Sequence, residues 1–415
     1  MQAISTNNLY STTVGEALNV QTQWSVAETQ QASGLKAGDF GSLGGGDSRE
    51  MLNLSTDIAQ ATNWASVSKT VGTTTQAMYT AVGTMQSAVN KLQTLISTSM
   101  SSPNNSDLLG QAQQIMATLL TQVNQQVSGN YLFAGTNTSV APVNLTHYPT
   151  LAPQVDSSGN PILDGNGNQV YGYAPNTADT SYYTGDGTIQ SAQVNLQQTV
   201  SYGVLASNPA MEEAIRAVQQ VIEAAQVSAN GTTTATNPDS PSSVSGGTLT
   251  VNNQTFNITG GASLDQIAQS INQQANGSGV TASVVPDTTG NYHLRVSNGM
   301  SAMTITDNAG LGLSSASPES AANLTNSLKS TLTTANQAVA DLGNLQETIS
   351  NVSNTLNTAS QTQTTFVTYL QNSMSNVKDV DTAQAAAQVQ QYQTQLQASF
   401  LAVSTLTKLS LASFL

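Results

Sequence analysis

Apolar residues recur at helical spacing near both ends of the chain. The C-terminal stretch, residues 377–415, contains neither Gly nor Pro. Its apolar seam, with steps of three, four and seven residues, consists of Val389, Tyr392, Leu396, Val403 and Leu406, flanked by Phe400 and Leu409. A stripe of this kind is typical of a helix that lies against another helix. The pattern therefore predicts one long helix that needs a long partner.

The N-terminal stretch carries a matching stripe. Its seam consists of Tyr10, Val14, Ala17 and Trp24, with Leu18 beside it. A helix over residues 377–415 would be roughly 50 Å long at about 1.5 Å per residue, which exceeds the span of one small globular core. We therefore predict that the two ends of the chain pack against each other.

Further helices are predicted between the ends. Helical spacing covers residues 48–99 and 106–127, with Gly129 as a stop signal, and it continues from residue 318 to the end with a bend near Ser375. Asn208-Pro209 opens another helix, because Asn is a favoured cap and Pro fits the first helical turn.

The middle of the chain has a different pattern. Residues 131–207 alternate short β-like segments with Gly-, Asn- and Pro-containing turns. Residues 229–243 form a low-complexity stretch that we expect to be a linker. Residues 246–312 predict two strands, a helix and two more strands. Asn252-Asn253 fits the first hairpin turn, and Ser263 with Gln266 forms a capping box for the helix.

These elements predict an α+β fold in which long terminal helices form a coiled-coil and helical-bundle domain from both chain ends, with a β-rich insertion in the middle. We expect four parts. They are the terminal coiled-coil helices (1–47 and 376–415), a helical bundle (48–135 and 318–375), a β-rich middle region with one helix (136–230) and an inserted β-β-α-β-β module (231–317).

Composition narrows the possible functions. The formal net charge of -14 disfavours binding to nucleic acid or to an anionic membrane. Only 8% of residues are charged, and neutral polar surface costs less to desolvate, which suits a protein that packs against copies of itself. The absence of cysteine excludes disulfides and thiolate metal sites. No stretch resembles a membrane span or a cleavable signal peptide, so we expect any export to leave the N-terminus uncleaved.

Residues that could carry chemistry are few. His147 and His293 lie apart from any metal-ligand or catalytic pattern, so we interpret both as structural. Asp164 begins a segment like a calcium loop, but Gln169 stands where such a loop needs Gly, so a hairpin turn is the better interpretation. We expect no catalytic residue, cofactor or metal.

Tyr131, Leu132 and Phe133 form a dense apolar triplet that we expect to join the β-rich part to the helices.

Several stretches carry a family resemblance. SGNYLFAGT at 128–136, YYTGDGTIQ in the middle region, DVDTAQAAAQVQQYQTQLQAS near the end and the terminal SLASFL resemble the flagellin superfamily of bacterial axial proteins. Within it, the chain is most similar to the hook-associated protein 3 family, which joins hook to filament. The segment at 246–312 resembles the inserted motif of flagellins and of the filament cap protein. The chain departs from the family at two places. The family usually has a basic residue just after the initiator Met, where this chain has Gln2-Ala3, and it usually has an Asp-Pro turn where this chain has GSLGGGDSRE.

The resemblance implies a structural subunit rather than an enzyme. It implies a ring of copies built through the terminal helices, with the first hook-associated protein and flagellin as neighbours. It also implies an extracellular place in the flagellum, export through the flagellar type III apparatus and a dedicated export chaperone. Two alternatives stay open at this point: flagellin itself, and a secreted surface adhesin with a helical stalk.

Overall fold

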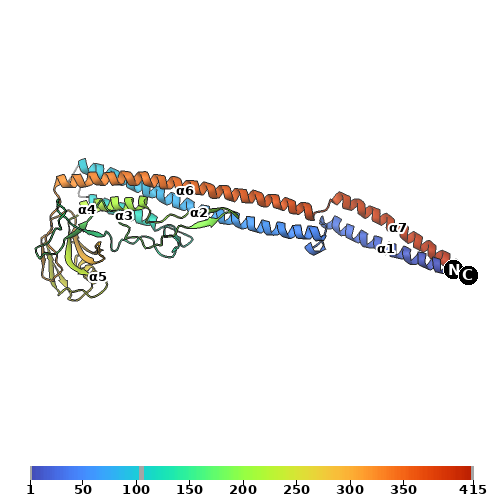
Figure 1. The fold of residues 1–415 in the computed structure, drawn as a ribbon, viewed down its shortest axis with the longest axis horizontal. Helices are drawn as coiled ribbons and strands as arrows, with labels where there is room; N and C mark the ends of the chain where they lie inside the picture. Colours follow the sequence, from blue (N-terminus) through green and yellow to red (C-terminus); the bar gives the residue numbers. More distant parts are fainter. Residues whose placement is uncertain (1, 102–106, 413–415) are drawn as a thin grey trace. The chain divides into compact units, whose positions relative to one another are not determined.

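The computed structural model has an α+β fold, as predicted, with long helices at both chain ends and small sheets in the middle (Figure 1). It describes the backbone of residues 2–101 and 107–412, and the side chains of residues 8–101 and 107–408. The chain divides into two compact units. One contains residues 1–67 and 358–415, and the other contains residues 68–357. The four domains expected from the sequence remain predictions.

The first unit brings the two chain ends together. Helix α1 (Gln2–Ser33) and helix α7 (Thr382–Ala412) lie side by side along their lengths (Figure 1). A short 3-10 turn (Phe40–Ser42) follows α1, and the unit also contains the beginning of α2 (Gly45–Ser101) and the end of α6 (Ala321–Lys378). The prediction that the terminal helices pack together is confirmed.

The break between α6 and α7 falls at residues 379–381, a few positions after the predicted bend near Ser375. The chain after α1 pairs with it there. The backbone N–H of Lys36 donates to the carbonyl of Lys378 at 2.8 Å, and Val380 donates to the carbonyl of Gly34 at 2.9 Å. The Asp381 carboxylate then caps α7 by accepting from the backbone of Ala383 and Gln384. These bonds fix where α1 ends and where α7 begins.

The second unit has a helical core. Helices α3 (Leu108–Val123) and α4 (Pro209–Ala224) pack on each other, and their buried residues share a core with α2 and α6. The predicted Asn208 cap is confirmed, since its side chain accepts from the Ala210 N–H at 3.0 Å. Helix α3 ends four residues earlier than predicted. Asn124 leaves the helical pattern because its side-chain amide pairs with the backbone N–H and C=O of Val143, both at 3.0 Å.

Short antiparallel strand pairs follow α3. They are β1 (Gln126–Val127) with β2 (Asn130–Tyr131), β3 (Leu151–Pro153) with β4 (Tyr171–Tyr173), and β5 (Ser191–Gln193) with β6 (Thr199–Ser201). None exceeds three residues, so hydrogen bonds from turn side chains hold much of this region in place. The prediction of strands and turns here is confirmed.

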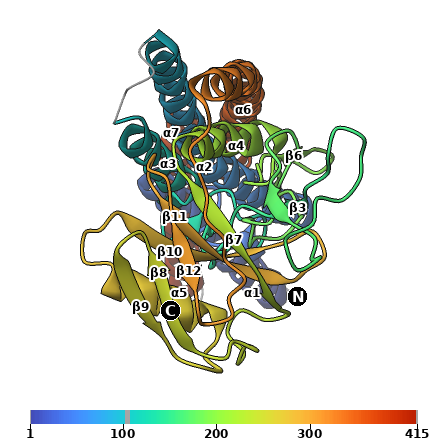
Figure 2. The ribbon, with the colours of Figure 1, turned by 90° about the vertical axis from the view of Figure 1, so that its left-hand side faces the viewer.

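Two three-stranded sheets and one helix lie between α4 and α6 in the second unit (Figure 2). One sheet has the order β10-β11-β7 and the other β12-β8-β9. The elements are β7 (Ser228–Ala235), β8 (Gly247–Val251), β9 (Gln254–Ile258), α5 (Leu264–Gln274), β10 (Val280–Pro286), β11 (Tyr292–Asn298) and β12 (Ile305–Asp307). Phe256, Ile271 and Leu294 belong to their common buried core.

The predicted turn and helix cap in this part are confirmed, but the prediction of a linker at residues 229–243 is wrong. Asn252 has a positive φ of 52° at the β8–β9 turn, and Ser263 with Gln266 forms a complete capping box. Residues 229–243, expected as a linker, instead contribute most of β7, which pairs with β11. The Thr-rich run is stabilised as a strand because β11 supplies its hydrogen-bond partners. Gly231 is needed there, since an added Cβ would lie 2.6 Å from the Leu311 carbonyl oxygen.

Candidate assembly surface

The paired terminal helices bury mainly small side chains. Ala17 and Ala27 of α1 and Ala385 of α7 are the buried apolar residues on the described parts of these two helices. The predicted seam residues Val14, Trp24, Val389, Tyr392, Leu396, Val403 and Leu406 are half-buried. Their three- and four-residue spacing matches one contact line between α1 and α7.

Larger apolar side chains on the same helices remain exposed. Tyr10, which we predicted on the N-terminal seam itself, is exposed rather than packed in it. Leu18 and Phe400, which we predicted beside the seams, are exposed by 59% and 57%. Leu9, Val26 and Leu401 are also exposed, and Leu401 reaches 71%. The side chain of Leu409 lies outside the described residues. The sequence pattern missed Leu401 because it falls off the repeating stripe, although a Phe-Leu pair within a polar helix could have marked it.

The predicted triplet divides between core and surface. Phe133 and Leu132 are buried in the core shared with α2, α3, α4 and α6, with Phe133 at 0% exposure. Tyr131 is only half-buried. Phe133 also accepts a backbone bond from Ala206 at 2.9 Å. The structure therefore anchors this segment to the helical core through two of the three residues.

Two of the sequence stretches that carry the family resemblance meet next to the triplet. The Thr136 N–H and hydroxyl both donate to the Asp186 carboxylate, and Asp186 donates its own N–H to the Ala134 carbonyl. The hydrogen bonds from Thr136 lower the pKa of Asp186. Gly135, with φ of +72°, leaves no room for a Cβ, which would lie 2.1 Å from the Asp186 carboxylate. These hydrogen bonds hold the stretches at 128–136 and 182–190 together.

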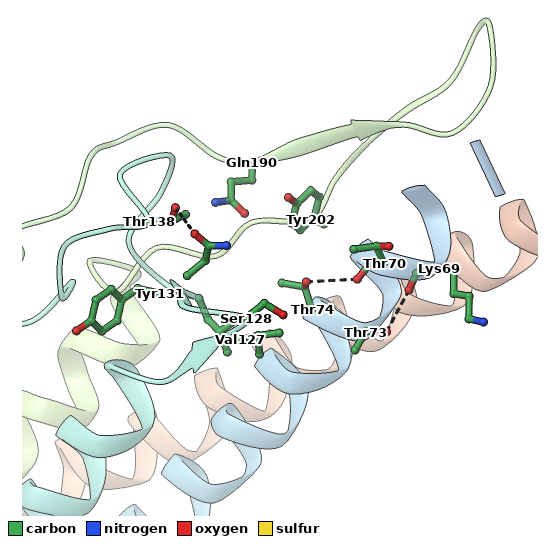
Figure 3. Close-up of a pocket in the computed structure, with 12 residues that line it drawn as sticks. Lys69, Thr70, Thr73, Thr74, Val127, Ser128, Tyr131, Thr138, Gln190 and Tyr202 are labelled. Atoms are coloured by element: carbon green, nitrogen blue, oxygen red, sulfur yellow. Dashed lines mark hydrogen bonds between the residues drawn. The ribbon is translucent and has the colours of Figure 1, made fainter. Parts of the chain in front are cut away.

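A polar pocket of about 440 Å³ opens beside the same segment (Figure 3). Helix α2 contributes Lys69 and three threonines, the β1–β2 hairpin contributes Ser128 and Tyr131, and Gln190 with Tyr202 flanks the β5–β6 hairpin. The hydroxyls of Thr73 and Thr74 donate to backbone carbonyls of α2. Most of its lining residues are polar, and none of them is an aspartate, glutamate or histidine.

Both histidines pair with aspartates. His293 is buried, with Nε2 2.9 Å from the Asp287 carboxylate and Nδ1 2.8 Å from the Gly231 carbonyl. Burial opposes ionisation of Asp287, but hydrogen bonds from Thr289, His293 and Asn291 outweigh it and lower its pKa. His147 lies 3.2 Å from Asp265 at a more exposed position. These contacts are structural, since they fix the β10–β11 turn and α5.

Other candidate chemistry is accounted for by turns. The Asp164 carboxylate accepts from the backbone of Asn166 and Asn168, as the hairpin interpretation expects. Within the described ranges, no three His, Asp or Glu side chains group as a metal site. In the same part of the chain, no helix is both long and apolar enough to cross a bilayer.

Two protein-family models match the chain. Residues 248–317 match the flagellin hook IN motif, and residues 308–415 match the bacterial flagellin C-terminal helical region. The second match contains α6 and α7, and the first covers all but the first two residues of the segment that the sequence likened to the inserted motif of flagellins. Residues 248–415 are therefore similar to flagellin family models, in line with the resemblance. No curated protein matches the chain.

Solved flagellar proteins are similar at low identity. A structure described as a flagellar hook-associated protein from Vibrio parahaemolyticus is 10% identical, with a TM-score of 0.42, and the match covers 79% of this chain and 96% of that one. Flagellar hook-associated protein 3 from Legionella pneumophila is 14% identical, with a TM-score of 0.37 and coverage of 79% and 98%. FlgL from Xanthomonas campestris is 13% identical, with a TM-score of 0.39 and coverage of 77% and 98%.

Proposed function

We propose that this chain is a structural subunit of the bacterial flagellum that joins the hook to the filament. The observation that carries the proposal is the flagellin C-terminal region at 308–415, which ends in a helix that pairs with α1 and leaves large apolar side chains exposed. Large exposed apolar side chains that gather on one surface mark protein interfaces. The chain acts through assembly rather than catalysis.

Neighbouring copies cover the exposed side chains in this account. The α1–α7 pair buries small residues in its own seam and leaves Leu18, Phe400 and Leu401 outside. A pair with a narrow seam gains most of its stability from further helices packed around it. Copies of the chain in a ring supply those helices, so the terminal helices form the inner wall of a short tube.

The remaining partners follow from the superfamily. The first hook-associated protein lies on one side of the ring and flagellin on the other. The chain leaves the cell through the flagellar export apparatus with its N-terminus uncleaved, and a chaperone holds the C-terminal helix before export. Low charge on the helices supports close packing among these proteins, because few charges lose water on assembly.

Flagellin is the second candidate. The match of residues 248–317 to the flagellin hook IN motif favours it, because the sequence likens that segment to insertions in flagellins. A filament subunit would be present in thousands of copies, whereas a junction subunit is present in roughly a dozen, as the superfamily implies. Copy number per flagellum therefore separates the two candidates.

Electron microscopy of a strain that lacks this chain tests the proposal. We expect hooks without filaments, together with flagellin monomers in the medium, because filament subunits have no junction on which to polymerise. Filaments of normal length would contradict any axial role. Hooks without filaments and without flagellin in the medium would instead identify the chain as flagellin.

A further inference from the structure

A small cavity lies where four segments of the second unit meet. It measures about 120 Å³, and its lining comes from residues 148–152 and 173–179, from Arg216 of α4, and from Thr288 in the β10–β11 turn. A direct backbone bond already joins two of these segments, from the Thr288 N–H to the Leu151 carbonyl at 2.9 Å. A single water molecule needs roughly 10–15 Å³ of such space, so several small molecules fit.

Two hydrogen-bond donors of this lining have no acceptor. The hydroxyls of Tyr148 and Tyr173 are buried and lack a partner among the described residues, and Tyr148 as a whole is 7% exposed. Burial raises the pKa of both phenols, and nearby carboxylates raise it further, so both keep their protons at neutral pH. A buried hydroxyl without a partner is costly, which makes an unseen acceptor the expected arrangement.

The carboxylates of Asp179 in the lining and of Glu212 nearby already accept hydrogen bonds. The Asp179 carboxylate accepts from the Thr150 N–H at 2.7 Å, from the Thr150 hydroxyl at 3.2 Å and from the Ser181 N–H at 2.9 Å. Glu212 accepts from Arg216 at 2.8 Å and from the Asp179 N–H at 3.1 Å. A bound molecule satisfies the two phenol donors only if it can accept hydrogen bonds.

The charges around the cavity select against ions. The two carboxylates of Asp179 and Glu212 outnumber the one guanidinium of Arg216, so an anion is repelled. A cation finds no carboxylate oxygen free of hydrogen bonds, and it meets Arg216. The remaining class is uncharged molecules with oxygen acceptors.

We propose that this cavity is a binding site for small uncharged molecules that accept hydrogen bonds, and that ordered water occupies it in aqueous solution. The bound water accepts from Tyr148 and Tyr173 and joins the β10–β11 turn to α4 through shared hydrogen bonds. It thereby helps hold the inserted module on the helical core, next to the buried contact of Arg295 with Glu223.

Single Tyr148→Phe and Tyr173→Phe variants of the full chain test this site through the sign of the change in melting temperature. If water satisfies the phenols, each variant loses hydrogen bonds at nearly constant volume, and its melting temperature falls. If the cavity is dry, each variant removes a buried unsatisfied hydroxyl, and its melting temperature rises. A rise or no change in either variant overturns the proposal.

Two control variants give the changes in melting temperature against which these results are compared. Tyr182→Phe removes a buried hydroxyl that donates directly to the Ala206 carbonyl at 3.2 Å, so it sets the drop expected for a satisfied phenol. Tyr369→Phe changes a residue that is 65% exposed and should leave the melting temperature unchanged. A high-resolution crystal structure of the unaltered chain is a second test. It should show water within about 3.2 Å of both phenol oxygens, and a cavity without density overturns the proposal.

Discussion

Replacing Phe400 and Leu401 together by aspartate is expected to abolish filament attachment while leaving the core of the second unit folded. Both side chains are exposed in the single chain, so the substitutions remove no internal packing. In the proposed ring they are covered by neighbouring copies. Burying each is worth about 1.5–3 kcal/mol. Their joint loss, about 3–6 kcal/mol per copy, weakens assembly by roughly 10²- to 10⁴-fold.

The measurement is complementation of the deletion strain, scored as hooks that carry filaments in electron micrographs. Gln397→Asp is the matched control, because it adds a charge to an exposed polar position of the same helix and removes no apolar surface. Melting curves of the purified variants check that folding is unaffected. Filaments at the normal frequency in the double variant would show that this face of α7 is not an assembly contact.

Phe133→Ala is expected to destabilise the second unit by about 3–5 kcal/mol, the usual effect of truncating a buried Phe. Phe133 is fully buried in the core that α2, α3, α4 and α6 share, and it belongs to the segment that connects that core to the strands. Thermal unfolding followed by circular dichroism measures the change. The melting temperature of the unit should drop by several degrees or more.

Tyr131→Ala is the control for this prediction. Tyr131 lies two residues away in the same segment but is half-buried at the edge of the polar pocket (Figure 3). Its truncation leaves the core filled, so the melting temperature should change much less. Equal losses for the two variants would mean that the segment, rather than the Phe133 side chain, carries the effect.

The sequence predicted the features that local spacing encodes. The stripes on the terminal helices, the Asn208 cap, the Ser263 capping box and the turn at Asn252 all depend on residues within a few positions of one another. Each has a direct physical signature in the sequence. The pairing of the chain ends followed from the length of the stripes, since no short partner could cover them.

The features that the sequence did not predict depend on distant partners. Strand β7 looks like a linker until β11, more than 50 residues later, supplies its hydrogen bonds. Helix α3 stops early because Asn124 pairs with Val143. The contact of Thr136 with Asp186 joins two stretches 50 residues apart, and no local pattern in either one indicates the other.

The folding of both terminal helices is expected to depend on assembly with neighbouring copies. Fixing a residue's backbone costs about 1–2 kcal/mol of conformational entropy. Against this, the α1–α7 pair fully buries only alanines among its described apolar residues. We therefore expect both ends to be largely unfolded in the free monomer and to fold when neighbouring copies cover them.

Hydrogen exchange on the dilute monomer, read by mass spectrometry, tests this claim most directly. The amides of residues 8–33 and 382–408 should exchange at nearly the rate of an open chain, while those of α4 in the core stay protected. Limited proteolysis should likewise trim residues before about Ser48 and after about Ser375. Helical protection at both ends of the monomer, comparable with that of α4, would contradict the account.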